Sequence, residues 1–169
     1  GGLAPVRSDA LAVATSNMTG NKVDPYLQRH VAYDVAVDPG LRGTRAFASA
    51  NLRVQLDNSA PSEGLPVGVI GPFLPQFVAG QNRMYFEIYT PLEMTASTLD
   101  GAEVDMREFA ERGRNVYTRF VSVYAQSSAV VEADLEGIVD LPGGWYELDL
   151  KHQPLVPRDL HLAAPCAAA

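Results

Sequence analysis

Hydrophobic and polar residues alternate along most of the chain, and this period of two is typical of β-strands with one buried face. The clearest run is Thr44 to Asp57, where the even positions are apolar and the odd positions are polar, except for Phe47. Arg29 to Val37 alternates in the same way. Residues 38–43 between the two runs contain one proline and two glycines, which favour a turn. We therefore predict a β-hairpin with one buried and one solvent-facing side.

Further strands are expected upstream and downstream of this hairpin. They are Ala10–Thr15, Arg83–Thr90, Asn115–Ala125, Ser128–Glu136 and Trp145–Lys151. In the third of these, the apolar positions change parity between Phe120 and Val121, which predicts a bulge or a strand buried on both faces. Seven strands separated by turns favour an all-β, antiparallel β-sandwich of the immunoglobulin-like or Greek-key type, with seven or more strands. We expect a single domain over residues 8–162, with flexible termini at 1–7 and 163–169.

Two segments do not alternate. Val104 to Arg112 fits either a short helix that ends at Gly113 or an edge strand followed by a loop. Asn58 to Gln81 is rich in proline and glycine, and loops of this length are usually functional or flexible. Its apolar residues are expected to be exposed and to form a protein-contact surface. They are Val69, Ile70, Phe73, Leu74 and Phe77.

Composition and charge narrow the function classes. A chain of 169 residues with 47% hydrophobic residues can bury a core without a metal or a disulfide. The formal net charge of -7 and the scattered arginines argue against a nucleic-acid partner. Cys166 is the one cysteine, which excludes an internal disulfide and a cysteine-based zinc site. The apolar stretch Leu65 to Ala79 is interrupted and shorter than the roughly 18 residues that a membrane span needs, so we expect no direct membrane insertion.

No catalytic motif is present, and we predict no catalytic residue, metal or cofactor. The three histidines, His30, His152 and His161, are dispersed and are interpreted as structural or solvated. Glu132, Asp134 and Glu136 share one strand face, which is typical of a solvated sheet surface. A calcium-stabilised domain is an alternative, with loop oxygens as ligands, although no calcium-loop motif is present. Its candidate ligands are Asp38, Asp57, Asn58 and Asp100.

The densest polar segment is Ser16 to Tyr26. Its Asn, Gly and Asp residues either shape a turn through side-chain to backbone hydrogen bonds or form a small ligand-binding site. The candidate binding residues are Asn17, Asn21, Lys22, Asp24 and Tyr26. A second possible ligand surface is a platform of aromatic side chains for sugar rings, although strand aromatics more often belong to the core. Its members would be Tyr85, Tyr89, Tyr117 and Trp145.

A series of short motifs, in this order and spacing, resembles a known family. The motifs are Asn17, Gly20-Asn21-Lys22, Asp24, Tyr26, Arg29-His30-Val31-Ala32-Tyr33, Asn58-Ser59-Ala60-Pro61, Tyr89-Thr90-Pro91, Leu99-Asp100-Gly101, Glu111-Arg112-Gly113-Arg114, Tyr146-Glu147-Leu148-Asp149-Leu150 and Gln153-Pro154. From about residue 8 to about residue 158 the chain is similar to the C-terminal portion of the bacterial family called domain of unknown function 4012. The resemblance implies an extracytoplasmic domain of a membrane-anchored envelope protein, often actinobacterial, with the anchor upstream. It assigns no activity, and therefore no catalytic residue.

Two functions follow as hypotheses. The first is a non-catalytic cell-envelope domain that acts as a scaffold or as a binding module for a protein partner or a wall glycan. The alternative is an enzyme, or part of one, that acts on envelope polysaccharide, with Lys22, Asp24 and an acidic strand residue in a cleft. The sequence does not indicate the oligomeric state.

Overall fold

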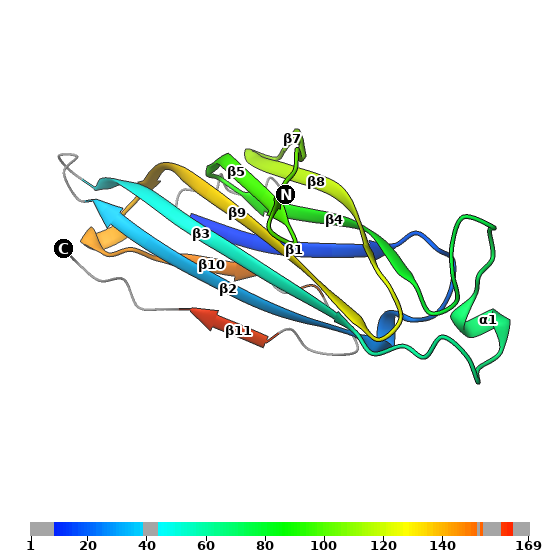
Figure 1. Cartoon of the computed structure of the whole chain (residues 1–169). Coiled ribbons are helices and arrows are strands. Elements are labelled where there is room, and N and C mark those ends of the chain that lie inside the picture. The colour runs from blue at the N-terminus through cyan, green and yellow to red at the C-terminus, as the bar shows by residue number, and fades with distance from the viewer. Residues whose placement is uncertain (1–8, 39–43, 152, 154–159, 164–169) are drawn as a thin grey trace.

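The computed structural model describes residues 9–38, 44–151, 153 and 160–163, and this part of the chain is largely strand (Figure 1). The strands are β1 (Asp9–Asn17), β2 (Leu27–Asp38), β3 (Arg45–Asn58), β4 (Asn82–Thr90), β5 (Glu93–Leu99), β6 (Ala102–Glu103), β7 (Arg107–Glu111), β8 (Arg114–Val123), β9 (Ser127–Asp140), β10 (Leu148–Lys151) and β11 (Leu160–Ala163). The helical elements are short: η1 (Asp24–Tyr26), α1 (Val67–Ile70) and η2 (Pro142–Gly144).

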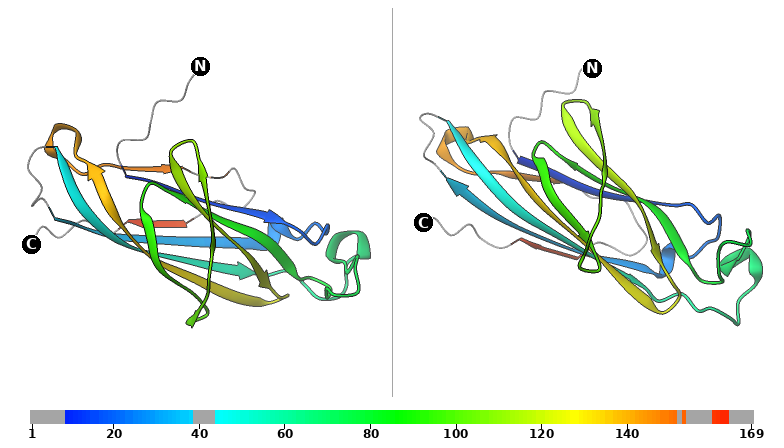
Figure 2. Two further views of the ribbon diagram at one scale, coloured as in Figure 1. Left: turned by 90° about the horizontal axis from the view of Figure 1, so that it is seen from above. Right: turned by 45° about the horizontal axis from the view of Figure 1, so that its top comes forward.

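The described strands form two sheets stacked face to face, as Figure 2 shows. The first sheet has the order β10-β1-β4-β8-β7, and the second has the order β11-β2-β3-β9-β5-β6. The predicted all-β sandwich is confirmed, and so are its seven expected strands. One detail differs, because β10 pairs with β1 and β11 pairs with β2 in parallel, so both sheets are mixed at one edge. The expected turn at 39–43 and the expected terminal tails lie outside the described residues, apart from Ala163, which ends β11.

The core lies between the two sheets and follows the predicted alternation. Every even position of β3 from Ala46 to Leu56 is buried, and Phe47 is 41% exposed, as its odd position requires. Residues Met84, Phe86 and Ile88 of β4 pack into the same cluster from the opposite sheet. The β2–β3 hairpin is antiparallel over its whole length, from Leu27 opposite Asn58 to Asp38 opposite Phe47. The alternation therefore predicted both the strands and the buried face.

Strand β8 has no bulge, since its register is continuous with β4 on one side and with β7 on the other. Instead, Val116, Tyr117 and Thr118 are buried in succession. The strand is therefore covered on both faces at residues 116–118, but at the predicted parity change Phe120 is 47% exposed on the outer face and Val121 is buried, so neither predicted alternative describes that position. The neighbouring segment 104–112 contains β7 and no helix, so its interpretation as an edge strand is confirmed.

Polar side chains, among them Arg29, Gln153 and Asp9, lie between the sheets. Arg29, on the inner face of β2, is only 1% exposed, and its Nη1 donates hydrogen bonds to the Val13 carbonyl oxygen (3.1 Å) and to Gln153 Oε1 (2.9 Å). The Gln153 amide also pairs with β1, because its Oε1 accepts from Thr15 N–H and its Nε2 donates to Thr15 C=O, both at 2.9 Å. The Gln153 side chain thus continues, beyond the end of β10, the pairing that the β10 backbone makes with β1.

The buried carboxylate of Asp9 accepts hydrogen bonds from the hydroxyls of Tyr33 (2.9 Å) and Tyr146 (2.5 Å). Burial, and then the charge of Asp9, raises the pKa of Tyr33 far above its ordinary value of 10.0. Tyr33 therefore stays a neutral donor to Asp9. This contact joins β2 to β1 across the interior of the sandwich.

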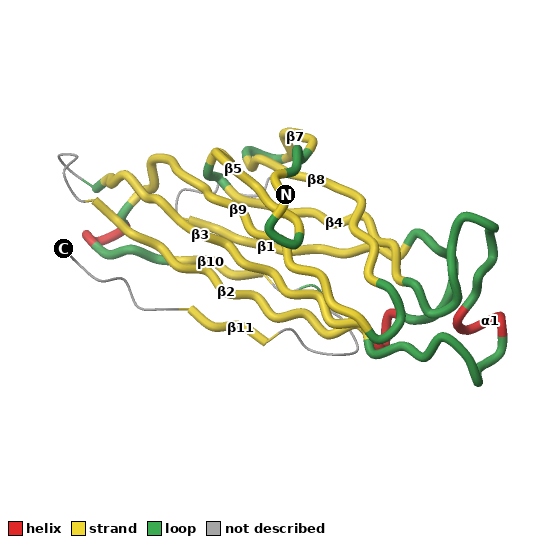
Figure 3. Tube along the Cα trace, viewed as in Figure 1, coloured by secondary structure: helices red, strands yellow, loops and turns green. Residues whose placement is uncertain are grey.

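The loops gather at the end of the sandwich next to α1 (Figure 3). The expected long loop is present between β3 and β4, and α1 is its one helical turn. A second small core forms here from Val23, Ala60 and Ile70. Gly80 closes the loop, since its N–H donates to the Ile70 carbonyl oxygen at 2.7 Å and its φ of 74° lies in the left-handed region.

Gly80→Ala is expected to destabilise the fold by about 3 kcal/mol or more, because a Cβ atom there would lie 2.5 Å from Pro61 O and 2.8 Å from Ala125 Cβ. Gly64→Ala is the matched control in the same loop: it has a similar φ of 82° and no atom within 4 Å, so only the backbone strain of about 1 kcal/mol applies. Urea unfolding measures both values. Equal losses in the two variants would show that the contacts around Gly80 do not determine the loop.

Candidate functional site

The candidate binding residues Asn17 and Asn21 form a hydrogen-bonded loop. Asn17 Oδ1 accepts from Thr19 N (2.9 Å) and Thr19 Oγ1 (2.6 Å), and Asn17 Nδ2 donates to Asn21 Oδ1 at 2.9 Å. Asn21 is buried, and its Nδ2 donates to the Gln81 carbonyl oxygen at 2.8 Å. Both side chains therefore act on the backbone around them, as the turn-shaping interpretation expects.

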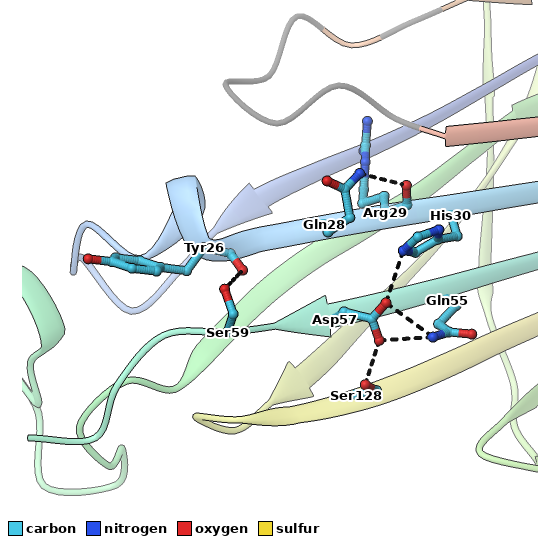
Figure 4. Close-up of polar contacts among 8 residues, drawn as sticks. All are labelled: Tyr26, Gln28, Arg29, His30, Gln55, Asp57, Ser59 and Ser128. Carbon is cyan, nitrogen blue, oxygen red and sulfur yellow. Dashed lines mark hydrogen bonds and ion pairs between the residues drawn. The ribbon is translucent and has the colours of Figure 1, made fainter.

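Lys22, Asp24 and Tyr26 belong to the same loop but face different surroundings. Lys22 and Asp24 are exposed, and Asp24 Oδ1 accepts a hydrogen bond from Asn82 Nδ2 at 3.2 Å. Tyr26 is half-buried against the small second core, and its carbonyl oxygen accepts from Ser59 N (3.0 Å) and Ser59 Oγ (3.1 Å; Figure 4). Among the described residues, no hydrogen bond or ion pair joins Lys22 to Asp24. The structure thus brings residues 17–26 against the 59–81 loop without pairing their charged groups.

Asn58 holds this end of the sandwich together. It is buried at the end of β3, and its Nδ2 donates to the carbonyl oxygens of Gly80 (2.8 Å), Val123 (3.0 Å) and Tyr124 (3.1 Å). Its Oδ1 accepts from Ala60 N–H at 3.1 Å. One side chain therefore links the two ends of the 59–81 loop, at Ala60 and Gly80, to the end of β8. Sequence analysis considered Asn58 as a calcium candidate and as part of a family motif, and assigned it no role in holding the loops. The signal it missed is that Asn58 continues the inward-facing even positions of β3.

A second polar group lies near the same end, on the outer face of β2, β3 and β9 (Figure 4). Asp57 is at its centre: Oδ2 lies 3.1 Å from His30 Nε2, and Oδ1 accepts from Ser128 Oγ at 2.5 Å. Gln55 Nε2 also donates to both oxygens, at 2.9 and 3.1 Å. A serine nucleophile needs the histidine between serine and aspartate. Here the aspartate is in the middle and Ser128 bonds to the aspartate, so the arrangement supports a structural role for His30.

The Asp57 carboxyl has a lowered pKa. Burial raises the pKa, but the hydrogen bonds from Ser128 and Gln55 and the neighbouring His30 outweigh burial, and the pKa lies below its ordinary value of 3.8. Since the fold favours the charged form of the carboxyl, Asp57 contributes its full stabilisation at pH values above the ordinary pKa of 3.8. The contribution is lost as pH falls through the folded-state pKa.

Asp57→Asn is expected to make the loss of stability below pH 3.8 shallower than in the wild type, because the variant has no charge to lose at this position. Urea unfolding between pH 5 and the acid limit of the fold measures the slope. The control is Asp34→Asn on the same sheet face, since Asp34 has no hydrogen bond or ion pair among the described residues. The same slope in Asp57→Asn and in the wild type would contradict the assignment.

Two of the open grooves on the described part of the chain lie on the sheet faces, and neither of these two includes Lys22 or Asp24. The larger, about 510 Å³, lies on the outer face of the second sheet, where Asp34, Asp134 and Glu136 surround the small residues Ala36 and Ser49. The smaller, about 330 Å³, lies on the outer face and edge of the first sheet. The acidic residues of β9 are also bonded to neighbouring strands, since Arg53 contacts Glu132 at 2.6 Å and Asn51 donates to Asp134 at 2.9 Å. The row lies on an exposed sheet face, as the sequence predicted.

The calcium candidates are not brought together. Asp38 pairs with Phe47 at one end of the β2–β3 hairpin, whereas Asp57 pairs with Gln28 close to the other end. Asp100 Oδ1 accepts from Val130 N–H at 2.8 Å. Within the described ranges, no group of three or more His, Cys, Asp or Glu side chains is arranged to hold a metal ion.

The four aromatic candidates do not form one platform. Tyr117 is buried in the core, and its hydroxyl accepts from Met94 N–H at 2.9 Å. Tyr85 and Tyr89 share the outer face of β4, where burial and then Glu87 raise the pKa of Tyr89 to about 12. Trp145, which is 77% exposed, follows η2. Tyr85 and Tyr89 thus share one strand face, with Glu87 between them.

The five apolar contact candidates of the 59–81 loop differ in exposure. Ile70 is 4% exposed and belongs to the small second core, so its expected place on a contact surface is wrong: the loop folds back over Val23 and covers it. Val69 and Phe77 are half-buried. Phe73 and Leu74 are exposed as predicted, at 48% and 49%.

Three further exposed apolar residues were missed by the sequence analysis. Met18, Val67 and Val78 are each about half exposed or more, and they belong to the same group of loops. Phe73 Cδ2 lies 3.9 Å from the position of a Cβ on Gly20, so the 59–81 loop touches the 17–21 segment. We call the exposed set the loop patch, and it consists of Met18, Val67, Phe73, Leu74 and Val78.

Asn58→Ala is expected to destabilise the protein by about 3 kcal/mol, because it leaves buried carbonyl oxygens of Gly80 and Val123 without their donor. Asn51→Ala removes an exposed amide that donates to Asp134 and is expected to cost about 0.5 kcal/mol or less. Denaturant unfolding compares the two. A loss in Asn58→Ala no larger than in Asn51→Ala would show that Asn58 does not hold the loops together.

Comparisons with known proteins identify no family. No family model matches the chain, and no curated protein matches it. Among solved structures, the chain is similar to a Legionella pneumophila protein named "putative nutrient binding protein", with a TM-score of 0.47 and 7% sequence identity. The match covers 80% of this chain and 47% of that one, so this chain spans about half of that protein's length. Within the described residues, no helix is long and apolar enough to cross a membrane. The fold and the site define the class as an all-β sandwich with loops concentrated at one end.

Proposed function

We propose that this chain is a non-catalytic, extracytoplasmic domain of a bacterial cell-envelope protein, and that it binds a protein partner through the loop patch. The observation that supports the proposal is the grouping of exposed apolar side chains on loops at one end of the sandwich. Exposed apolar clusters of this kind commonly mark interaction surfaces. The envelope location and membership of the family called domain of unknown function 4012 belong to the same proposal and rest on the sequence motifs.

The loops that carry the loop patch are held in place by buried hydrogen bonds and by packing, which favours binding. Asn58 and Asn21 bond to the carbonyl oxygens of Gly80 and Gln81, and Lys22 N–H donates to the Val69 carbonyl oxygen at 2.8 Å. Ile70 fixes the helical turn to the small second core. A loop that is ordered before binding loses less conformational entropy on association, so more of the contact free energy contributes to affinity.

This proposal also allows a wall glycan as the ligand, or a scaffold role without any ligand. If the ligand is a glycan, Tyr85 and Tyr89 on the outer face of β4 would contact its sugar rings. A glycan that binds only the folded protein raises its melting temperature, whereas a scaffold would show no shift.

An enzyme acting on envelope polysaccharide is the alternative function. The observation in its favour is the groove of about 510 Å³ on the second sheet, because it contains Asp34, Asp134 and Glu136. Glycoside hydrolysis uses two carboxylates on either side of a sugar ring. Release of reducing sugar from wall polysaccharide, abolished by Asp134→Asn, would establish this alternative in place of the binding role.

Phe73→Asp combined with Leu74→Asp is expected to reduce capture of the partner from an envelope extract at least tenfold, because it places two charges in the loop patch. Both side chains are about half exposed, so the melting temperature should change little. The control is Phe47→Asp with Ile138→Asp, an exposed apolar pair on β3 and β9. Capture is quantified by mass spectrometry. Equal capture by the wild type and by the Phe73/Leu74 variant would exclude the loop patch as the binding surface.

A further inference from the structure

Strand β7 is an open edge of the first sheet. It pairs with β8 on one side and with no described strand on the other, and all five of its residues, Arg107 to Glu111, are exposed. An unpaired edge presents backbone N–H and C=O groups that can pair with another strand. Figure 1 shows β7 at the outer side of β8.

The hairpin turn determines which backbone groups of β7 are free. Arg112 and Gly113 both have positive φ, 52° and 79°, which identifies a two-residue turn of the primed type. The residues that close such a turn, Glu111 and Arg114, are a hydrogen-bonded pair, and hydrogen-bonded pairs alternate along an antiparallel ladder. Phe109 and Arg107 therefore also direct their backbone groups to β8. Those of Glu108 and Ala110 face the open side.

The sequence of β7 is complementary to itself about Phe109. If a second copy of β7 runs antiparallel with Phe109 opposite Phe109, then Arg107 lies opposite Glu111 of the second copy, and Glu108 lies opposite Ala110. The outward-facing backbone groups of Glu108 and Ala110 then bond reciprocally. The Phe109 pair and the two Arg107–Glu111 pairs occupy the non-hydrogen-bonded positions, where side chains are closest.

The outer face of the sheet supports the same arrangement. Phe109 pairs with Val116, and Val116 pairs with Tyr89, so an apolar row runs across three strands and ends at the open edge. Phe109 is 52% exposed there. In the symmetric dimer the apolar row of one chain continues into the same row of the second chain, and the two Phe109 side chains cover each other. Arg107 and Glu111 flank the row on the same face, since alternate residues of a strand share a face.

We propose that two copies of this chain associate through β7, in antiparallel register about Phe109, so that their two five-stranded sheets become one continuous sheet. This goes beyond the proposed function, because it assigns a second surface and a partner, which is the chain itself. Strand β7 pairs with the first half of β8, from Arg114 to Thr118, whereas Asn58 holds the loops at Val123. The dimer therefore leaves both loop patches free.

The test is sedimentation equilibrium of the whole chain over increasing concentration. The wild type is expected to form dimers, and Arg107→Glu and Glu111→Arg are each expected to weaken dimerisation at least tenfold, because each places like charges opposite one another. The double variant exchanges the two charges and is expected to restore dimerisation to within about threefold of the wild type. Glu103→Arg, an exposed residue on β6 in the other sheet, controls for the change in net charge and should leave the dimer unchanged.

Ala110→Pro provides a second, independent variant. It removes the N–H that faces the open side, and proline is tolerated at such an edge, so the variant should fold and stay monomeric. Its melting curve verifies folding. A wild type that is monomeric at the highest soluble concentration would overturn the proposal. Dimers that are unaffected by the single charge changes, or that the double variant does not restore, would overturn it as well.

Discussion

The end of the sandwich that carries the loops depends on one buried amide, that of Asn58. The amide donates hydrogen bonds to the carbonyl oxygens of Gly80 in the long loop and of Val123 in β8. Strand β8 belongs to the opposite sheet from β3, where Asn58 lies. These oxygens are away from water, and an unmet buried acceptor costs free energy comparable to a lost hydrogen bond. The 59–81 loop, which carries part of the small second core and most of the loop patch, is held to both sheets at this point.

The interior between the sheets is closed by polar contacts as well as by apolar packing. Arg29 is desolvated, and a buried charge is tolerated only with several partners, of which Gln153 and the Val13 carbonyl are two. Gln153 also pairs with the Thr15 backbone. In the same layer, Asp9 accepts from Tyr33 and Tyr146. These contacts tie the C-terminal part of the described chain to β1 and β2, where β10 and β11 add the parallel edge strands.

The sequence predicted the strands that have one buried and one solvated face, and β3 is the clearest of them. It missed β5, because a bulge between Met94 and Ala96 interrupts the alternation, and it left β7 ambiguous, because both of its faces are exposed. In the site, the local hydrogen bonds around Asn17 follow from residue type, and the exposure of Phe73 follows from its place in a loop rich in proline and glycine. The burial of Ile70 and the acceptors of Asn58 come from segments distant in sequence, which alternation does not report.

The two proposed surfaces reinforce each other physically. The loop patch is at the end of the sandwich where Asn58 meets Val123, and the β7 edge pairs with the other half of β8. A two-fold axis through Phe109 would therefore give each dimer two symmetric loop patches joined by a continuous sheet. A partner with two equivalent sites at a matching distance would be held by both patches at once. The second contact forms at high effective concentration, so weak individual contacts give strong overall attachment.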